Sequence, residues 1–355
     1  MIKLIVILIL SLSFQTRVIS ISAESVILMD QGSGRILYAK NIDNQKLIAS
    51  ITKIMTAVLA IESKKLDEVV KIDEKILKAY GSNIYIEINE EIRLKDLIYG
   101  LMLRSGNDAA IAIANFVSND EEAFVQLMNK KANKLGMKNT VFCNPHGLDE
   151  KCDNLSTARD MAILTKYANS INIYKQISGT KRYVTKSNLK TYDWYNKNKL
   201  LSTYKYTTGG KTGYTERARR TLVTTASKNN LDLIVVTLND PNDFKNHQQL
   251  YEYGFNNYYN YLVLNKETFN LDNDFYSHPL YINNSYYYPL KKEETETISL
   301  KIKLYKNYHP KDNEQVGVIE VYKKRNKIHE EPIYIKIKRE HSRKSFFRRL
   351  LRLFR

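Results

Sequence analysis

The order of the expected secondary-structure elements constrains the fold of this 355-residue chain more than any other feature. Residues 25–39 read as two strands joined by a glycine-rich turn, which is typical of a hairpin. Helical periodicity follows, and helices are expected at 51–64, 94–103, 107–117, 120–135 and 157–169. Strand-like runs return at 220–227 and 231–238. Strands, a block of helices and strands again predict an α+β fold in which helices pack on an antiparallel sheet.

After about residue 260 the helical periodicity ends and short alternating runs begin. Apolar residues alternate with polar ones at 298–304 and again at 333–337, which predicts half-buried strands of a small β-rich domain. We therefore expect four parts in the chain. They are a signal peptide at 1–22, the large α+β domain at 23–262, a β-rich domain at 263–337 and a C-terminal helix at 338–355.

Residues 1–22 have the anatomy of a secretory signal peptide. A basic start with Lys3 precedes an unbroken apolar run at 4–10, and small residues follow at Ser20 and Ser22. Cleavage is expected after Ser22, and the alternative is an uncleaved N-terminal anchor. Export makes a nucleic-acid partner improbable, although the chain carries a formal net charge of +17.

The segment 338–355 accounts for much of this positive charge. It holds eight Lys or Arg residues and one Glu, so it contributes +7 of the +15 that remains without the first 22 residues. On a helical wheel its leucines and phenylalanines occupy one arc and its arginines the other. This pattern predicts an amphipathic helix that lies on an anionic membrane surface. A solvated basic tail and a helix packed on a protein partner are the alternatives.

The two cysteines, Cys143 and Cys152, lie nine positions apart in a loop-like stretch. Their spacing is not that of a zinc site, so an exported chain either joins them in a local disulfide or keeps two free thiols. The chain shows no dense cluster of His, Asp and Glu and no glycine-rich phosphate loop. We therefore expect no metal and no cofactor.

Ser50 and Lys53 form a Ser-x-x-Lys motif at the start of the helix expected at 51–64. One helical turn places both side chains on the same face, within reach of each other. A lysine whose pKa is lowered by desolvation and positive neighbours can take the proton of a serine nucleophile. The alternative is that Ser50 only caps the helix.

Two further triplets follow, Ser105-Gly106-Asn107 and Lys211-Thr212-Gly213. Each alone reads as an ordinary turn or cap. In this order and with these separations, however, the three motifs resemble the set found in penicillin-binding proteins and serine β-lactamases. The chain resembles the D-alanyl-D-alanine carboxypeptidases, the low-molecular-mass penicillin-binding proteins, over about 25–260. The matching stretches are 49–57, 103–110, 144–149, 156–162 and 210–215.

The resemblance implies a role for each motif residue. Ser50 would attack the terminal D-Ala-D-Ala peptide bond, Lys53 would take its proton, and Ser105 would pass that proton to the departing amine. The substrate-binding residues would be Asn107, Lys211, Thr212 and Gly213. The backbone N–H groups of Ser50 and Tyr214 would form the oxyanion hole.

The same resemblance implies a transpeptidase-like fold of the penicillin-binding-protein and serine β-lactamase type, followed by the small β-rich domain and the C-terminal helix. It also implies peptidoglycan stem peptides as substrates, β-lactam antibiotics as covalent inhibitors and a place at the outer face of the cytoplasmic membrane. A serine β-lactamase and a catalytically silent wall- or membrane-binding module are the alternatives. His146 is expected to be structural, and Arg217, Arg219 and Arg220 to be surface charges unless one assists carboxylate binding.

Overall fold

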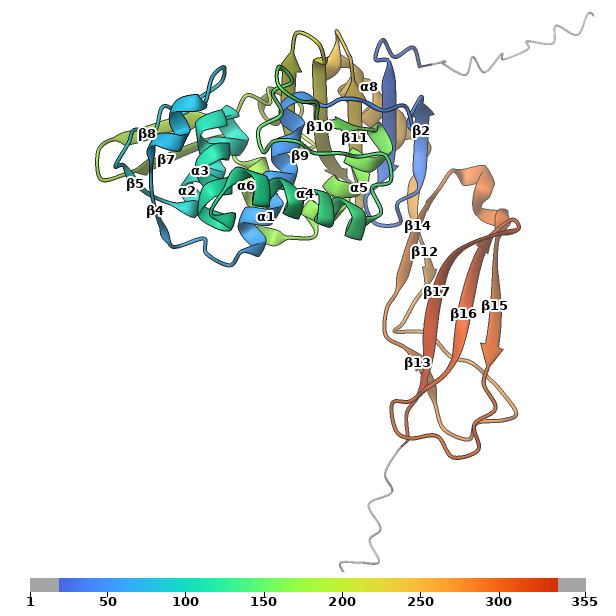
Figure 1. Ribbon diagram of the computed structural model, residues 1–355. Coiled ribbons are helices and arrows are strands. Elements are labelled where there is room, and N and C mark those ends of the chain that lie inside the picture. The colour runs from blue at the N-terminus through green and yellow to red at the C-terminus, as the bar shows by residue number, and fades with distance from the viewer. Residues whose placement is uncertain (1–18, 338–355) are drawn as a thin grey trace, which may run out of the picture. The chain divides into compact units, whose positions relative to one another are not determined.

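The computed structural model describes residues 19–337, which form two compact units (Figure 1). The larger unit comprises the chain up to Met29 together with Ile36–Ala226 and Leu233–Gly254. The smaller unit comprises the chain from Phe255 onward and two short segments, Asp30–Arg35 and Ser227–Asp232. The predicted helix at 338–355 lies outside the described residues, and so does the predicted signal peptide except for its last four positions. The predicted domain boundary after residue 262 stays a prediction.

Five strands form the central sheet of the larger unit, in the order β2-β1-β11-β10-β9. The predicted hairpin is formed by β1 (Ser25–Asp30) and β2 (Ile36–Lys40), which pair antiparallel. The two later strand-like runs become β10 (Arg219–Lys228) and β11 (Leu231–Leu238). At the edge of the sheet, β9 (Thr207–Thr215) pairs antiparallel with β10.

Helices cover both faces of this sheet. Successive side chains of a strand point to opposite faces, so the apolar residues of β1 pack against helices on either side. Ile27 and Met29 of β1 belong to the core shared with the helical block, whereas Leu28 approaches Gly254 in α8 (Asp243–Asn257). Figure 1 shows the helical block gathered beside the sheet. Its members are α1 (Lys53–Glu62), α2 (Leu94–Tyr99), α3 (Asn107–Ser118), α4 (Glu121–Leu135), α5 (Ala158–Asn169) and α6 (Asn172–Gly179). The predicted arrangement of helices on an antiparallel sheet is confirmed.

Two of the helix boundaries that differ from the prediction fall at the motifs. The expected helix at 51–64 begins at Lys53, because a 3-10 turn, η1 (Ala49–Thr52), precedes it and carries Ser50. The expected helix at 94–103 ends at Tyr99 and continues as a π-helical turn, η3 (Gly100–Arg104). Ser105 then adopts the left-handed conformation, with φ of 67°, and separates η3 from α3. Irregular helical turns of this kind are frequent at functional sites.

The remaining elements of the larger unit are short. The 3-10 turn η2 spans Glu74–Lys78 and the helix α7 spans Leu200–Thr203. Three two-stranded pairs complete the unit: β3 (Lys46–Leu47) with β6 (Leu155–Ser156), β4 (Val69–Lys71) with β5 (Glu91–Arg93), and β7 (Arg182–Lys186) with β8 (Thr191–Tyr195).

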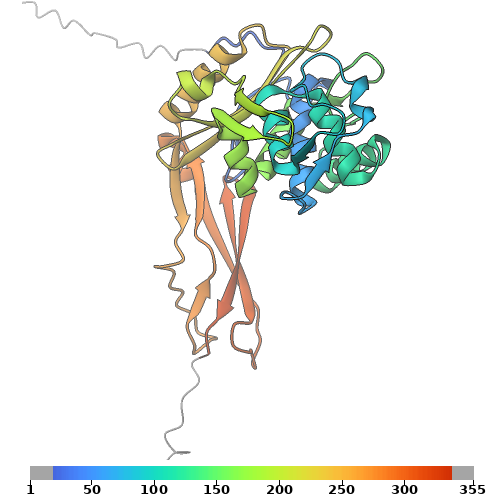
Figure 2. The ribbon, with the colours of Figure 1, turned by 90° about the vertical axis from the view of Figure 1, so that its left-hand side faces the viewer.

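The smaller unit is built from strands, as the alternating pattern predicts. One pair joins β12 (Tyr259–Leu264) to β14 (Tyr286–Leu290). A four-stranded sheet has the order β13 (Leu280–Ile282), β17 (Asn326–Ile335), β16 (Gln315–Lys323) and β15 (Ile298–Leu304). Figure 1 shows its long strands side by side, and Figure 2 shows the same strands turned by 90°. The 3-10 turn η4 (Lys292–Thr297) leads into β15. Ile333 and Ile335 are buried as expected, but Leu300 and Ile302 are 48% and 42% exposed because β15 is an edge strand.

Candidate active site

Ser50 lies in the 3-10 turn η1, directly before the buried helix α1. Ser50 is partly exposed, whereas Ile51 and Thr52 after it are buried. A 3-10 turn brings side chains three positions apart onto one face. Accordingly, the Lys53 Nζ lies 3.0 Å from the Ser50 Oγ. The serine and lysine of the first motif are therefore in direct contact.

The amine of Lys53 has three hydrogen-bond partners, and their chemistry determines what it can do. Its Nζ lies 2.7 Å from the Asn107 Oδ1, 2.5 Å from the main-chain oxygen of His146 and 3.0 Å from the Ser50 Oγ. The first two partners are carbonyl oxygens, which only accept. As an ammonium group, Lys53 donates to all three oxygens. In its neutral form it would keep two N–H donors for the two carbonyls and turn its lone pair to the Ser50 hydroxyl. This arrangement suits Lys53 to accept the Ser50 proton.

The surroundings of Lys53 also favour the neutral amine. Burial lowers the pKa of Lys53 well below its ordinary value, and the positive charges of Lys211 and Lys197 lower it further. The Asp108 carboxylate acts in the opposite direction. A lowered pKa increases the fraction of neutral lysine, which is the form that can act as a general base.

The second motif supplies Asn107 to the Lys53 amine and Ser105 to the Lys211 amine. Asn107 is the first residue of α3, and its amide donates to the Tyr80 carbonyl over 2.6 Å. This hydrogen bond turns the side-chain oxygen of Asn107 toward Lys53. Ser105, buried in its left-handed conformation, accepts from the Lys211 Nζ over 3.0 Å. The structure therefore brings residues 105 and 107 of the second motif to the two lysines.

Lys211 extends from the edge strand β9 into the same buried region. Its Nζ donates to the Ser105 Oγ and, over 2.6 Å, to its neighbour's main-chain oxygen at Thr212. Burial lowers the pKa of Lys211 to about 7, and the charge of Lys197 contributes. These hydrogen-bond partners are neutral, so a carboxylate that reached Lys211 would supply its missing counter-charge.

Gly213 allows β9 to approach the nucleophile closely. A Cβ at this position would lie 2.3 Å from the Thr221 Oγ1 and 3.0 Å from the Ser50 N. Thr221 in turn donates to the Ile48 carbonyl over 2.9 Å, which holds the start of η1 against β10. The main chain at Thr212 and Tyr214 therefore runs beside Ser50, where the family resemblance implies substrate binding and an oxyanion hole.

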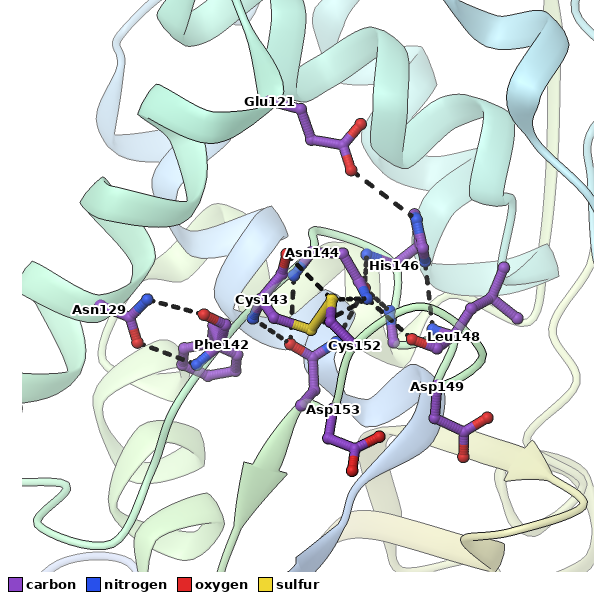
Figure 3. The surroundings of a disulfide bond; sticks show 12 residues. Glu121, Asn129, Phe142, Cys143, Asn144, His146, Leu148, Asp149, Cys152 and Asp153 are labelled. Atoms are coloured by element: carbon purple, nitrogen blue, oxygen red, sulfur yellow. Dashed lines mark hydrogen bonds and ion pairs between the residues drawn. A yellow bond between two sulfur atoms is a disulfide. The ribbon is translucent and has the colours of Figure 1, made fainter.

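His146 contributes its main chain rather than its ring. The Nδ1 accepts the Leu148 N–H over 3.1 Å, and the Nε2 lies 4.0 Å from the Glu121 Oε1 (Figure 3). Burial is the largest cause that lowers the pKa of His146 to about 3, so the ring is neutral at pH 7. The structure thus places the ring in a hydrogen-bonded loop and the carbonyl oxygen on Lys53, which agrees with the expected structural role.

The arginines after the third motif take part in ion pairs or are exposed. Arg217 pairs with Asp153 over 2.7 Å, and Arg220 pairs with Asp243 over 2.9 Å. Arg219 is exposed. Cys143 and Cys152, whose state the sequence left open, are joined in a disulfide (Figure 3).

Sequence reasoning missed two charged residues that act on the site. Lys197 donates to the Ser82 Oγ over 3.0 Å, and its charge lowers the pKa values of both Lys53 and Lys211. Asp108 accepts N–H groups of Ile84 and Tyr85 and so holds the loop that contacts Asn107. Asp108 follows the second motif directly, which was an available signal, whereas Lys197 belongs to no motif.

The geometry is suited to acyl transfer to a serine that a buried lysine activates. A family model described as D-alanyl-D-alanine carboxypeptidase matches residues 13–242, and one described as the C-terminal domain of penicillin-binding protein 5 matches 263–341. The first match covers more than half of the chain, so the chain belongs to the D-alanyl-D-alanine carboxypeptidase family.

Individual proteins with similar sequences and structures agree with this assignment. The chain is 39% identical over 220 residues to the D-alanyl-D-alanine carboxypeptidase DacF of Bacillus subtilis, covering 60% of this chain and 56% of that protein. It is 34% identical over 257 residues to DacC of Escherichia coli, covering 66% and 62%. Penicillin-binding protein 5 from Haemophilus influenzae has a similar structure, with a TM-score of 0.75, 28% identity and coverage of 89% and 97%. The chain thus spans less than two thirds of the length of the curated relatives named here.

Two further observations concern residues 19–337. Within this range, no group of three or more His, Cys, Asp or Glu side chains could hold a metal ion. None of the helices in the same range is both long enough and apolar enough to cross a membrane.

Proposed function

We propose that this chain is a serine-type D-Ala-D-Ala carboxypeptidase that removes the terminal D-alanine from peptidoglycan stem peptides. The observation that carries the proposal is the hydrogen bonding of Lys53, whose two carbonyl partners leave its lone pair to the Ser50 hydroxyl. A serine becomes a competent nucleophile when an adjacent base accepts its proton.

The reaction begins when the Ser50 oxygen attacks the carbonyl carbon between the two D-alanines and Lys53 takes the hydroxyl proton. A covalent bond forms from Ser50 to the peptide, and the carbonyl oxygen becomes negative. The N–H groups of Ser50 and Tyr214 would stabilise that oxygen, a role supported by the close approach of Gly213 to the Ser50 N.

Collapse of this intermediate breaks the C–N bond and expels D-alanine as an amine. The proton on Lys53 must reach that amine, and Ser105 is the proposed carrier. Ser105 accepts a hydrogen bond from Lys211, and Asn107 accepts one from Lys53. Only Gly106 separates Ser105 from Asn107 in the chain. Water then hydrolyses the ester at Ser50, with Lys53 again accepting a proton.

Recognition of the terminal carboxylate is the proposed role of Lys211 and Thr212. The Lys211 amine is buried among neutral partners, and its lowered pKa reflects the absence of a nearby counter-charge strong enough to offset burial. Asn107 and Gly213 would hold the peptide beside the edge strand β9. A β-lactam carries a comparable carboxylate and a reactive amide, so it would acylate Ser50 and inhibit the enzyme.

The test uses the purified full-length chain and a peptide that ends in D-Ala-D-Ala, with Ser50→Ala as the control. We expect release of D-alanine and covalent labelling of Ser50 by a penicillin, and neither in the control. Absence of both from the unaltered chain would overturn the proposal. Turnover of penicillin much faster than cleavage of the peptide would instead favour a serine β-lactamase.

The proposed place of action is the outer face of the cytoplasmic membrane. It is supported by the signal-like segment 1–22, by the basic amphipathic segment 338–355 and by the family's carboxypeptidase relatives. Removal of 338–355 should release the enzyme from anionic phospholipid vesicles and leave D-alanine release in solution unchanged. Equal vesicle binding by both forms would contradict the anchoring role.

A further inference from the structure

A disulfide closes the loop whose centre contacts the catalytic lysine. Cys143 and Cys152 are bonded, and the residues between them include His146 (Figure 3). The carbonyl oxygen of His146 accepts from Lys53. The next carbonyl toward the N-terminus, at Pro145, accepts from the Thr56 Oγ1 over 2.6 Å. Two successive main-chain oxygens of this loop are thus hydrogen-bonded to α1.

The ends of the loop are fixed by a polar network around two asparagines. The Asn154 Oδ1 accepts from the Cys143 N–H over 2.7 Å, and the Asn154 amide donates to the Asn144 Oδ1 over 2.8 Å. The Asn144 Oδ1 also accepts from the Gly147 N–H over 2.6 Å. This network and the disulfide hold the same short segment, as Figure 3 shows.

The middle of the loop lies directly against the nucleophile turn. Gly147 has φ of 92°, and a Cβ at this position would lie 2.0 Å from the Ala49 carbonyl oxygen and 3.0 Å from the Ser50 N. Two backbones that meet this closely transmit a displacement of one to the other. A shift of the loop therefore moves both the His146 oxygen and the Ser50 turn.

The far side of the loop reaches the end of β9. The Asp149 carboxylate accepts from the Thr215 Oγ1 over 2.6 Å, and Asp153 pairs with Arg217. Arg217 also donates to the Asp149 main-chain oxygen. The segment 143–153 thus links the base, the nucleophile turn and the strand beside Tyr214.

We propose that the Cys143–Cys152 disulfide is a positioning element for the catalytic base, because it holds the His146 carbonyl where it occupies one N–H of the Lys53 amine. The inference rests on the proposed serine-peptidase function. A disulfide restricts the conformations open to the loop that it closes. Without it, the His146 oxygen leaves the amine for part of the time, and the Lys53 lone pair is no longer held on Ser50.

Opening the loop also changes the solvation of Lys53. Burial is the largest cause of its lowered pKa, and the other charged groups that act on it are Lys211 from β9, Lys197 after β8 and Asp108 from α3. The neutral ring of His146 belongs to the loop itself. A loosened loop admits water beside the Nζ while these three charges stay in place, so the pKa of Lys53 rises toward its ordinary value. The acid limb of the acylation rate then moves to higher pH.

The experiment measures acylation of the full-length chain by a fluorescent penicillin from pH 5 to 9. The oxidised chain is compared with the chain reduced by dithiothreitol, which becomes a cyclic disulfide as Cys143 and Cys152 become thiols. The exposed position of Cys152 makes the bond accessible to the dithiol. The reductant is removed under argon before the assay, and the thiols are counted by alkylation and mass measurement.

We expect reduction to lower the limiting acylation rate by about tenfold, with little change in the half-saturating penicillin concentration, and to raise the acid limb by about one pH unit. Reoxidation should restore both. The Cys143→Ser/Cys152→Ser variant should behave like the reduced chain and should not respond to dithiothreitol, which excludes an effect of the reductant elsewhere.

An unchanged rate and an unchanged acid limb in the folded reduced chain would overturn the proposal. Thermal unfolding and near-ultraviolet circular dichroism verify that the reduced chain is folded. The test therefore remains valid even if the Cys143→Ser/Cys152→Ser variant does not fold. Failure of the underlying function is distinguishable, because the oxidised chain would then neither be labelled by penicillin nor release D-alanine.

Discussion

In the larger unit the buried amine of Lys53 is hydrogen-bonded to neutral oxygens, whereas in the smaller unit the carboxylate of Glu320 meets the ammonium group of Lys303 at 2.7 Å. Both ionisable side chains are largely shielded from solvent, because Lys53 is 0% and Glu320 is 5% exposed. The pKa of Lys53 is lowered toward the neutral form by burial, and that of Glu320 is lowered toward the charged form by the hydrogen bond from Lys303. Burial without a counter-charge therefore makes Lys53 a reactive amine. Burial beside an opposite charge makes Glu320 part of a structural ion pair.

The largest effect that this comparison predicts follows removal of the uncompensated amine. Lys53→Ala should reduce acylation by penicillin by about 10³-fold or more, because the Ser50 hydroxyl loses its base. The chain should remain folded, since the lost group was buried without a counter-charge. Stopped-flow labelling gives the rate, and thermal unfolding gives the stability. The matched control is Lys303→Met in the smaller unit, and acylation lost equally in both variants would contradict the comparison.

Lys211 should show the next largest effect, and its sign depends on pH. A carboxylate is bound by the protonated amine, and the pKa of Lys211 is about 7 in the free enzyme. The kcat/KM for a peptide ending in D-Ala-D-Ala should therefore fall as pH rises through about 7, while kcat falls only at higher pH because a bound carboxylate raises that pKa. Lys211→Gln should lower kcat/KM by about 10²-fold and remove this alkaline limb. Lys205→Gln, exposed just before β9, is the control, and an alkaline limb that persists in Lys211→Gln would refute the assignment.

The serine site is also supported by the main chain of the loop that contains Gly147. Two glycines of similar conformation allow this support to be tested. Gly147 and Gly136 both have positive φ, at 92° and 78°, but only Gly147 lies against the nucleophile turn, whereas a Cβ at Gly136 would meet nothing within 4 Å. Alanine in the left-handed conformation costs about 1–2 kcal/mol at either position. Gly147→Ala should also slow acylation at least tenfold by displacing Ala49 and Ser50. Equal acylation rates in the two variants would show that the loop does not support the site.

The sequence pointed to the side chains that the structure brings together at the site better than to their surroundings. Ser50, Lys53, Ser105, Asn107 and Lys211 belong to local motifs, so their chemistry and order were visible in the chain. The contribution of the His146 carbonyl was not, because every residue carries such an oxygen and only the fold directs this one to Lys53. Lys197 was missed for a similar reason, since its field on Lys53 and Lys211 depends on distance in space.

The fold shows the same division between local and tertiary signals. The spacing of apolar residues along the chain predicted the helices α1, α3, α4 and α5, and strand-like runs predicted β10 and β11. It missed α8, whose polar residues are interspersed with the apolar ones that pack on the sheet. It also overestimated the burial of β15, since the sequence does not reveal which strand lies at a sheet edge.

The smallest expected effect comes from the compensated pair in the smaller unit. The pKa of Glu320 is lowered by Lys303, so the pair stabilises the fold above the ordinary carboxyl pKa of 4.5, and this contribution is lost as pH falls through the lowered value. The double variant Lys303→Met/Glu320→Gln should therefore show a smaller drop in melting temperature than the unaltered chain between pH 7 and pH 3. Its penicillin acylation should be unchanged, because neither residue contacts the serine site. If acylation fell while the pH dependence of melting stayed the same, the pair would contribute to catalysis rather than to stability. The contrast between the paired Glu320 and the unpaired Lys53 would then be wrong.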